Sequence, residues 1–594
     1  MSTPQQPQYP PYDPGRHAQP QRQYPAGPGT PYGTPPGYVP QEGPVPQLPP
    51  MQGMPPNRPR RKMPTWLVIT IALLVAVALN IAIIFGITKG VAQLIRSAGE
   101  YGSTNNGFTV HSATPPPEPA ARPDSVSAAF DKYYTQQYVW KSCDQGDGCA
   151  TFTAPSDWSD PDSKPIELHA AIHFAEDYAM GTLFINPGGP GASGADWLND
   201  FVEYTATDDL REHYDIIGFD PRGVADSTPI TCGTDTTLLD DYFLADPITA
   251  DNLDQSRAIA QRFADACRTS SGDIIDHVDT QSVARDLDML RALAGQTRLN
   301  YLGFSYGTYI GSTYAALFPK QTGRIVLDGA INPTEDSATS TIEQAVGFEK
   351  ALATYLNDCI KNDGSCPFKG MDTNQATKEI QSWLATADTK PWPTSSGKRV
   401  NGITMMYGII LPLYSEDNWT YLTQAFKELK DTGKADTLLL LADTYLGRNE
   451  NGKYTDNSME ANLAVNCLDD PPTSDMARQE AIAKELGEKA PTFGRFMTYG
   501  NIGCEALKQD RSGIGKLDYS APGASPILVV GTTGDPATPY QAAVNLAKLL
   551  ESGVLLTYKG EGHTAYTYTN SCVAETVDDF LIHGKVPSSD VTCG

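Results

Sequence analysis

With 594 residues, the chain is too long for a single hydrophobic core, so we expect more than one folded unit. Its 70 acidic residues outnumber its 44 basic ones, and the formal net charge is −26. This charge argues against nucleic acid or an anionic lipid surface as a partner, because both are themselves negative.

The first segment, residues 1–62, is rich in Pro, Gln and Gly. Residues 1–57 hold 18 of the 47 prolines and few aliphatic side chains. Such a composition cannot bury enough apolar surface to offset the entropy lost on ordering, so we predict a disordered tail. The same composition makes the tail a candidate platform for a cytoplasmic partner.

A single membrane-spanning helix is predicted over residues 66–87. These 22 residues carry no charge, and they can cross a hydrocarbon layer of about 30 Å. Four basic side chains crowd residues 58–62, and positive residues stay in the cytoplasm, so the following chain should be extracellular. Residues 1–96 have 8 basic and 2 acidic side chains, a net +6, which leaves −32 for the remainder.

Beyond the membrane we expect a stalk, residues 89–124, and then an α/β core. Strand-like runs alternate with helical patterns, which predicts a mainly parallel sheet flanked by helices. The strand pattern stops between residues 334 and 515, where helical periodicity predicts a cap above the sheet. The core therefore has two parts, residues 125–333 and 516–594. The runs lie near residues 166–174, 181–186, 213–219, 299–304, 324–328, 526–531 and 553–558.

A glycine-rich loop, NPGGPGASG, occupies residues 186–194 after an apolar run. Backbone N–H groups in such a loop can stabilise negative charge that develops on a carbonyl oxygen. Gly189 or its neighbour Gly188 is the candidate donor. A phosphate-binding loop is the alternative, but the loop matches neither G-x-G-x-x-G nor a Walker motif.

The most informative motif is GFSYG at residues 303–307, between a strand-like run and a helix-compatible stretch. Strand, tight turn and helix form the setting of a nucleophile elbow, where flanking glycines let the backbones pack closely. Ser305 is therefore the candidate nucleophile. The N–H of the next residue, Tyr306, is the candidate second donor to an oxyanion.

A serine needs a base at neutral pH, and the base needs an orienting carboxylate. His563 is the candidate base, because it lies on a Gly-flanked loop beyond a β-rich run. Asp535 ends another buried-type run, 28 residues before His563, and is the candidate acid. Asp328 also ends a strand-like run and is the alternative acid. Ser, Asp and His then follow the order of α/β-hydrolases.

All ten cysteines follow the predicted membrane helix and fall into pairs that are close along the chain. Their even number and the lack of C-x-x-C spacing favour disulfides in an oxidising compartment over a zinc site. We expect no metal and no cofactor. The predicted pairs are Cys143–Cys149, Cys232–Cys267, Cys359–Cys366, Cys467–Cys504 and Cys572–Cys593.

Taken together, these motifs resemble the secreted bacterial tripeptidyl aminopeptidases, a branch of the prolyl-aminopeptidase-like serine hydrolases. The resemblance runs from about residue 125 to the C-terminus. It implies an α/β-hydrolase fold with a large helical cap, and cleavage of short peptides from free N-termini. The matching stretches are the loop 186–194, DPRG at 220–223, the elbow 303–307, VLDG at 326–329, GDPATP at 534–539 and GH at 562–563.

The resemblance extends to AVNCLD at residues 464–469, which is similar to an Ala-Ile-x-Cys-x-Asp stretch near the family's active site. An exopeptidase that counts from the N-terminus needs a carboxylate to meet the α-ammonium group. Asp469 is the candidate, with Asp470 next. The alternative interpretation of both residues is an exposed turn at the end of a helix.

We therefore predict a membrane-anchored, extracellular serine aminopeptidase that acts on peptides with free N-termini through an acyl-enzyme. An esterase or lipase is the alternative, because the same triad serves any acyl transfer. A second alternative is a catalytically silent hydrolase fold that acts as an envelope binding protein.

Overall fold

The computed structural model describes residues 117–470, 475–588 and 591–594. The predicted tail, residues 1–62, and the predicted membrane helix, residues 66–87, lie outside these residues, as does most of the predicted stalk. No helix in the described ranges is both long enough and apolar enough to cross a membrane.

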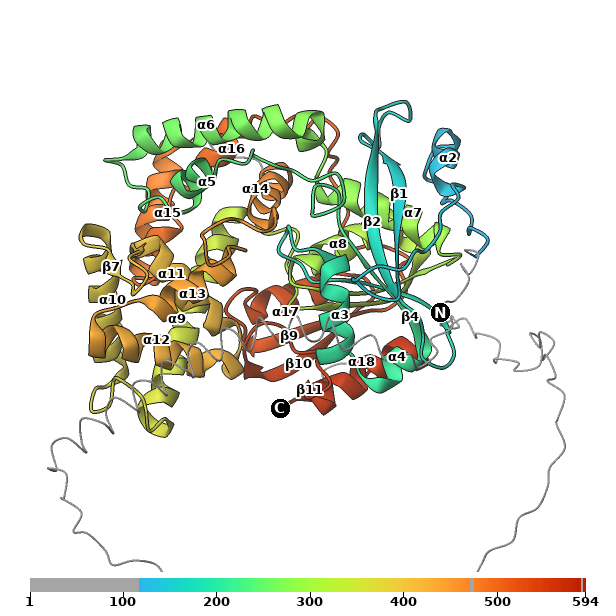
Figure 1. Ribbon diagram of the computed structural model, residues 1–594. Coiled ribbons are helices and arrows are strands. Elements are labelled where there is room, and N and C mark those ends of the chain that lie inside the picture. The colour runs from blue at the N-terminus through green and yellow to red at the C-terminus, as the bar shows by residue number, and fades with distance from the viewer. Residues whose placement is uncertain (1–116, 471–474, 589–590) are drawn as a thin grey trace, which may run out of the picture. The chain divides into compact units, whose positions relative to one another are not determined.

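A nine-stranded sheet runs through the described part of the chain (Figure 1). Its strand order is β1-β2-β4-β3-β5-β6-β9-β10-β11. β2 runs antiparallel to both of its neighbours, and all later neighbours are parallel, which confirms the mainly parallel sheet. The strands are β1 (Gly148–Pro155), β2 (Pro165–His173), β3 (Gly181–Asn186), β4 (Tyr214–Phe219), β5 (Leu299–Phe304), β6 (Thr322–Asp328), β9 (Ile527–Gly534), β10 (Gly553–Glu561) and β11 (Val591–Cys593).

Helices cover both faces of the sheet, so the parallel strands are buried on two sides. Leu183 and Ile185 of β3 belong to one apolar cluster, and Phe184 between them belongs to the other. This alternation follows from the two-residue period of a strand. The first cluster includes α3 (Gly194–Tyr204), α4 (Asp208–His213) and α18 (Ser571–His583), and the second includes α7 (Thr280–Leu293), α8 (Tyr306–Leu317) and α17 (Tyr540–Leu549).

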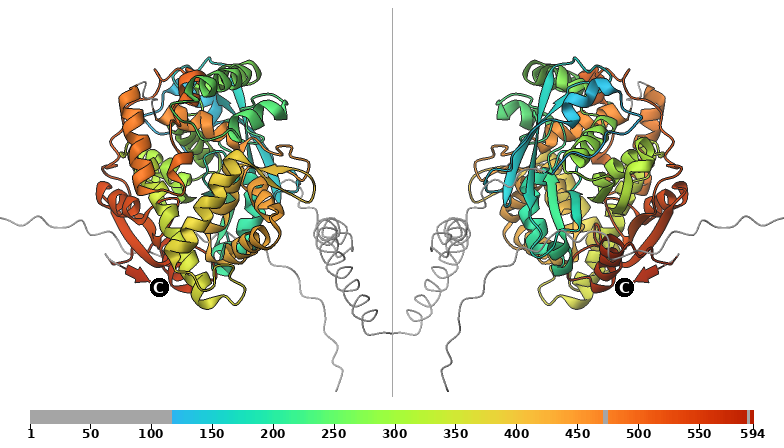
Figure 2. Two further views of the ribbon diagram at one scale, coloured as in Figure 1. Left: turned by 90° about the vertical axis from the view of Figure 1, so that its left-hand side faces the viewer. Right: turned by 90° about the vertical axis from the view of Figure 1, so that its right-hand side faces the viewer.

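The chain between β6 and β9 is helical apart from a short hairpin, as expected for a cap. Its first part has an apolar core of its own, in which Leu352, Met405 and Phe426 are fully buried. In the left view of Figure 2 these yellow to orange helices lie nearest the viewer. The elements are α9 (Ser337–Asn362), α10 (Thr373–Thr389), β7 (Trp392–Pro393), β8 (Arg399–Val400), α11 (Gly402–Ile410), α12 (Trp419–Thr432) and α13 (Asp436–Tyr445).

The second part of this insertion packs differently. Leu468 and Ile502 share a cluster with Phe263, which lies between β4 and β5 in the chain. Figure 1 shows these helices side by side above the sheet. The upper layer is thus built from two distant segments, α5 (Thr236–Phe243) and α6 (Leu253–Ser271) with α14 (Ser458–Asp469), α15 (Met476–Lys489) and α16 (Ile502–Leu507).

All ten cysteines lie within the described residues and form disulfides in the five predicted pairs. The Cys467–Cys504 bond joins α14 to α16. Each bond reduces the conformational freedom of the unfolded chain and so stabilises the folded one.

The segment after β4 contains a fully buried arginine, Arg222. Its guanidinium donates two hydrogen bonds of 2.7 Å to the carboxylate of Asp286, which also accepts from Nε1 of Trp158 at 2.9 Å. Further bonds to the carbonyl oxygens of Ser156, His277 and Pro155 use the remaining three N–H groups. This pair ties the end of β1 to α7 without leaving a buried charge unpaired.

Candidate active site

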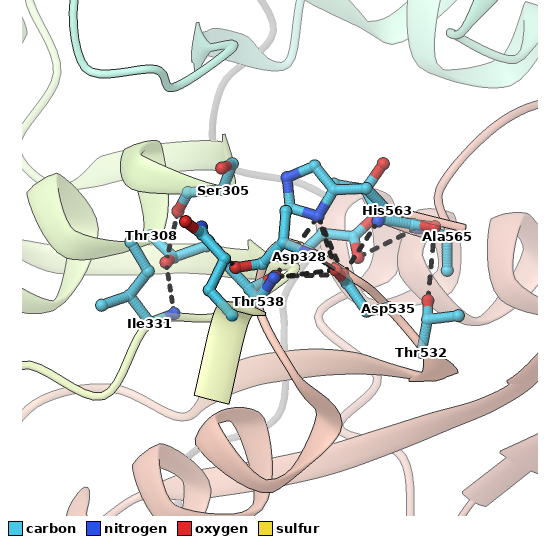
Figure 3. Close-up of polar contacts among 12 residues, drawn as sticks. Ser305, Thr308, Asp328, Ile331, Thr532, Asp535, Thr538, His563 and Ala565 are labelled. Atoms are coloured by element: carbon cyan, nitrogen blue, oxygen red, sulfur yellow. Dashed lines mark hydrogen bonds and ion pairs between the residues drawn. The ribbon is translucent and has the colours of Figure 1, made fainter. Parts of the chain in front are cut away.

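Ser305 lies on a sharp turn between β5 and α8. Its backbone angles, φ 53° and ψ −124°, are rare for a non-glycine residue, and such a conformation costs about 1–3 kcal/mol. The turn is held because the N–H of Ser305 donates to the carbonyl oxygen of Asp328 at 2.9 Å. The hydroxyl of Thr308 donates to the carbonyl oxygen of Ser305 at 2.6 Å (Figure 3).

The two glycines of the elbow lie where backbones come into contact. A Cβ on Gly303 would be 2.5 Å from the oxygen of Gly307, and a Cβ on Gly307 would be 2.8 Å from that of Asn186. Both distances are too short for a side chain. Strand, turn, helix and the loop 186–194 therefore pack backbone to backbone, which brings the loop beside Ser305.

The structure brings Asp535 and His563 together at the carboxyl edge of the sheet. Both carboxylate oxygens of Asp535 lie 2.9 Å from Nδ1 of His563. The carboxylate is oriented by the N–H groups of Ala537 and Thr538, at 2.9 and 2.8 Å, and by the hydroxyl of Thr538 at 3.0 Å. Its side chain is fully buried, so the imidazole meets a fixed negative charge.

Nε2 of His563 is left for Ser305. With Nδ1 bonded to Asp535, the neutral ring carries its free electron pair on Nε2. In Figure 3 this edge of the ring faces Ser305. Nε2 is buried and has no hydrogen-bond partner among the described residues. Burial by itself lowers the pKa of His563, but the attraction of Asp535, and then of Asp328, raises it above the ordinary 6.5.

Asp328, the alternative acid, makes a different set of contacts. Its carboxylate accepts from the N–H groups of Ala565 and Tyr566 at 2.9 and 2.7 Å. Burial raises the pKa of Asp328 to about 6. The side chain of Asp328 thus fixes the loop that follows His563. The backbone carbonyl oxygen of the same residue accepts from the N–H of Ser305 and so holds the turn.

The loop 186–194 lies directly against the elbow. A Cβ on Gly188 would be 2.9 Å from the backbone nitrogen of Tyr306. The N–H of Gly188 already donates to Oδ1 of Asn186 at 3.0 Å. Gly189 lines the same cavity as Ser305, so of the two glycines its N–H is better placed for an oxyanion. The N–H of Tyr306 is in the first turn of α8, where helical N–H groups have no intrahelical acceptor.

The end of the loop is fixed by Asp220 of the DPRG segment. Its carboxylate accepts from the hydroxyl of Ser193 at 2.5 Å and from the N–H of Ala195 at 3.2 Å. Ser193 in turn caps the N-terminus of α3. Burial raises the pKa of Asp220 to about 6.

A cavity of about 110 Å³ opens beside Ser305. Two glutamates that the sequence analysis did not single out line it, Glu335 and Glu343. Burial, and then the charge of Glu343, raise the pKa of Glu335. Tyr414 also lines the cavity, and its carbonyl oxygen accepts from the N–H of His563 at 2.8 Å. Lining side chains from the core and from α9 include Ile331, Asn332, Gln344 and Thr538.

Asp469, the predicted partner of the substrate's α-ammonium group, is not among the residues that line this cavity. Its two carboxylate oxygens accept from the N–H and the hydroxyl of Thr280, at 2.9 and 2.6 Å. Burial raises the pKa of Asp469 to about 7. Asp470 is exposed. The ammonium role of these two residues stays a prediction.

The glutamates were missed because both lie in the predicted cap, just beyond its boundary near residue 334, and outside the motifs that pointed to the site. Glu335 precedes α9 and Glu343 lies in its second turn, so both reach the cavity beside Ser305 only when α9 packs against the core. In the sequence, the two glutamates are distinguished only by their separation of eight residues across the start of a helix. This separation predicts a site only if the face of α9 that is turned toward Ser305 is known.

The fold and the arrangement of Ser305, His563 and Asp535 define a serine hydrolase of the α/β-hydrolase type. Two family models match the chain: "alpha/beta hydrolase fold" over residues 181–366 and "TAP-like protein" over residues 490–593.

Curated relatives match three quarters of the chain at 30–38% identity. Serine protease Hip1 of Mycobacterium tuberculosis is 38% identical over 464 residues, which cover 75% of this chain and 87% of that protein. Carboxylesterase B of the same species is 35% identical, covering 75% and 86%. Tripeptidyl aminopeptidase of Streptomyces lividans is 30% identical, covering 75% and 83%. The chain belongs to the TAP-like family of α/β-hydrolases, and it is a serine hydrolase.

Proposed function

We propose that this protein is an aminopeptidase that releases short peptides from free N-termini. The observation that carries this proposal is the pair Glu335 and Glu343 in the cavity that contains Ser305. Two neighbouring carboxylates in a partly desolvated site repel each other, and an ammonium group between them removes that repulsion. The relatives named serine protease and tripeptidyl aminopeptidase support the choice of a peptide substrate.

Acylation begins when Oγ of Ser305 attacks the scissile carbonyl carbon. The hydroxyl proton passes to Nε2 of His563, and Asp535 stabilises the imidazolium that forms. The negative charge on the carbonyl oxygen is met by the N–H groups of Tyr306 and Gly189. When the C–N bond breaks, His563 returns its proton to the leaving amine, and the N-terminal fragment stays bound as an ester.

Deacylation repeats these steps with water. Nε2 of His563 accepts a proton from the water as its oxygen attacks the ester carbon, and the same two N–H groups meet the oxyanion. The bond from carbon to Oγ then breaks, Ser305 recovers its proton from His563, and the released fragment leaves as a free acid.

The test compares free-amine peptide substrates with their N-acetylated forms. Acetylation removes the positive charge, so kcat/KM of the wild-type enzyme should fall at least about tenfold. Glu335→Gln and Glu343→Gln should lower kcat/KM for the free-amine peptide. They should therefore reduce the difference in kcat/KM between the free-amine and the acetylated peptide. Glu488→Gln, which removes the same charge from the exposed surface of α15, is the matched control.

Two results would overturn the assignment. Equal hydrolysis of free and acetylated peptides would show that the protein is not an aminopeptidase, but it would not contradict the assignment of the catalytic triad. Undiminished labelling of Ser305→Ala by a fluorophosphonate would mean that another residue is the nucleophile. That variant should otherwise fold normally and lose all hydrolysis.

A carboxylesterase is the second candidate, and the relative named Carboxylesterase B favours it. The triad and the two oxyanion donors serve ester cleavage equally well. Simple esters belong in the same assay for this reason. An enzyme that cleaves plain esters faster than free-amine peptides, and is indifferent to Glu335→Gln, would be an esterase.

We also propose that the catalytic unit is extracellular and is anchored by one helix at residues 66–87, with a cytoplasmic N-terminus. Support comes from the uncharged run, the basic residues that precede it, and the five disulfides of the described chain.

A further inference from the structure

One helix of the upper layer, α14, touches both sides of the oxyanion site. Near its start, Nδ2 of Asn462 donates to the carbonyl oxygen of Pro190 at 3.0 Å. A Cβ on Gly191 would be 2.3 Å from the carbonyl oxygen of Ser458, so the loop backbone rests directly on the helix. Both contacts are made by the two residues that follow Gly189, the proposed donor from the loop.

At its C-terminal end, α14 is linked to Tyr306, the other proposed donor, by hydrogen bonds that pass through two hydroxyl groups. Asp469 accepts from the hydroxyl of Thr280 at 2.6 Å, and that oxygen lies 2.5 Å from the hydroxyl of Tyr306. Above its pKa of about 7, Asp469 is ionised and can only accept, so Thr280 then donates to it and Tyr306 donates to Thr280. The chain of hydrogen bonds therefore ends on the residue whose backbone N–H faces the oxyanion.

The spacing along the helix suits both contacts. Asn462 and Asp469 are seven residues apart, two helical turns, or about 10 Å at 1.5 Å per residue. One straight element can thus fix the two donors relative to each other.

The helix itself is held firmly at both ends. Nδ2 of Asn457 donates to the carbonyl oxygens of Gly223 and Ile230, at 2.8 and 2.7 Å. Near the other end, the disulfide from Cys467 joins α16, and Arg511 donates to two carbonyl oxygens of the last turn. Because α14 is anchored at both ends, it can hold the loop 186–194 and Thr280 in fixed positions.

We propose that Asn462 and Asp469 are positioning residues that set the separation of the two oxyanion donors, Gly189 and Tyr306. The inference rests on the proposed roles of those donors. It gives Asp469 a task other than meeting the α-ammonium group, because both of its carboxylate oxygens are engaged by Thr280. Neither residue is among those that line the cavity beside Ser305, and each acts through a neighbour.

The main test is Asp469→Asn, measured on three reactions: a free-amine peptide, its N-acetylated form, and labelling by an uncharged fluorophosphonate. An amide cannot accept at both positions, so Tyr306 should shift. Complete loss of one oxyanion donor costs about 100- to 1000-fold in kcat. A displaced donor should cost about 10- to 100-fold, with KM changed less than about threefold. The fall should be equal on all three reactions, since each develops the same oxyanion.

Three further variants keep the test independent of folding. Thr280→Val removes only the hydroxyl that joins Asp469 to Tyr306, and Thr280→Ser restores it. Valine should reproduce the loss of kcat, and serine should recover it. Tyr306→Phe keeps the backbone N–H, and combining it with Asp469→Asn should cost no more than either change alone.

Asn462→Ala tests the other end of the helix and should also lower kcat rather than raise KM. Its combination with Asp469→Asn should be worse than either, because each variant frees a different donor. Asp510→Asn, which removes the same charge at an exposed site near α14, is the matched control.

The results separate this inference from the proposed function. If Asp469→Asn leaves kcat unchanged on all three reactions, the positioning role is wrong. It is also wrong if the variant lowers kcat only for the free-amine peptide, so that the free-amine and acetylated peptides are cleaved at similar rates. Loss of labelling in Ser305→Ala would still support the triad in that case. If Ser305→Ala keeps its labelling, the proposed function fails whatever Asp469→Asn does.

Discussion

At the scale of single residues, two aspartates near His563 differ in what binds their oxygens. Asp535 faces Nδ1 of the imidazole, whereas the carboxylate of Asp328 accepts from the backbone N–H groups of Ala565 and Tyr566. Both end a strand and both are buried, so local sequence could not separate them. The difference arises from the loop after His563, whose backbone at Ala565 turns back onto Asp328.

The contacts of Asp535 predict a shift in the pH dependence of kcat/KM. His563 acts as a base in its neutral form, so activity should rise with pH through the pKa of His563, which lies above 6.5. Asp535→Asn removes the main attraction that raises the pKa of His563, and it leaves burial, which lowers this pKa, opposed only by the weaker attraction of Asp328. The midpoint should move to lower pH while kcat falls by about 1000-fold or more.

The comparison variant is Asp328→Asn. It should cost about 1–3 kcal/mol of stability, because one N–H of the loop loses its acceptor, and most of the activity should remain. Thermal unfolding and pH profiles of both variants check this. If Asp328→Asn abolishes turnover in a folded protein and Asp535→Asn does not, the roles of the two residues are reversed.

At the scale of elements, the cap does more than cover the site: it touches the loops that carry the triad. A Cβ on Gly347 of α9 would lie 2.4 Å from the carbonyl oxygen of Pro536, next to Asp535. Nε2 of Gln344 donates to the carbonyl oxygen of Ala537 at 3.0 Å. Since Tyr414 also holds the N–H of His563, two triad residues depend on the cap for their position.

Gly347→Ala should therefore impair catalysis although it favours the helix. Alanine is better than glycine within a helix by about 1 kcal/mol, but here its methyl group would strike the backbone beside Asp535. We expect a fall in kcat of about tenfold or more, as reacting groups are displaced by a fraction of an ångström. Steady-state kinetics and thermal unfolding measure the two effects separately.

The chain offers a matched control for this substitution. Gly487 lies within α15, where an added Cβ would have no atom of the described residues within 4 Å apart from the neighbouring residues and backbone of its own helix. Gly487→Ala should stabilise the protein by about 0.5–1 kcal/mol and leave kcat unchanged. Equal kinetics for the two alanine variants would show that α9 does not position the Asp535 loop.

At the scale of the whole molecule, apolar runs predicted the parallel strands because such strands are buried on both faces. The run at 181–186 coincides with β3, and the run at 299–304 with β5. β1 was not foreseen, since its threonine-rich sequence lies at the sheet edge and depends on pairing with β2. β11 has only three residues and is held by a distant partner strand and the Cys572–Cys593 bond.

The chemistry of the site was more predictable than its substrate contacts. Ser305, Asp535 and His563 lie in short motifs whose local geometry is set by glycines and strand ends. The roles of Glu335, Thr280 and the helix α14 could not be predicted in this way, because they depend on contacts between segments that are far apart in the chain. The joining of α5 and α6 to α14–α16 is of the same kind, because segments about 200 residues apart share one apolar cluster.

The last prediction tests the proposed extracellular location and membrane anchor. Five disulfides persist only in an oxidising compartment, and the charges around residues 66–87 predict a cytoplasmic N-terminus. A protease added to intact cells should release the catalytic unit and spare an N-terminal epitope tag. Thiol alkylation under denaturing, non-reducing conditions should modify no cysteine. Loss of the tag from unbroken cells would reverse the orientation, and alkylation of several cysteines would place the enzyme in a reducing compartment.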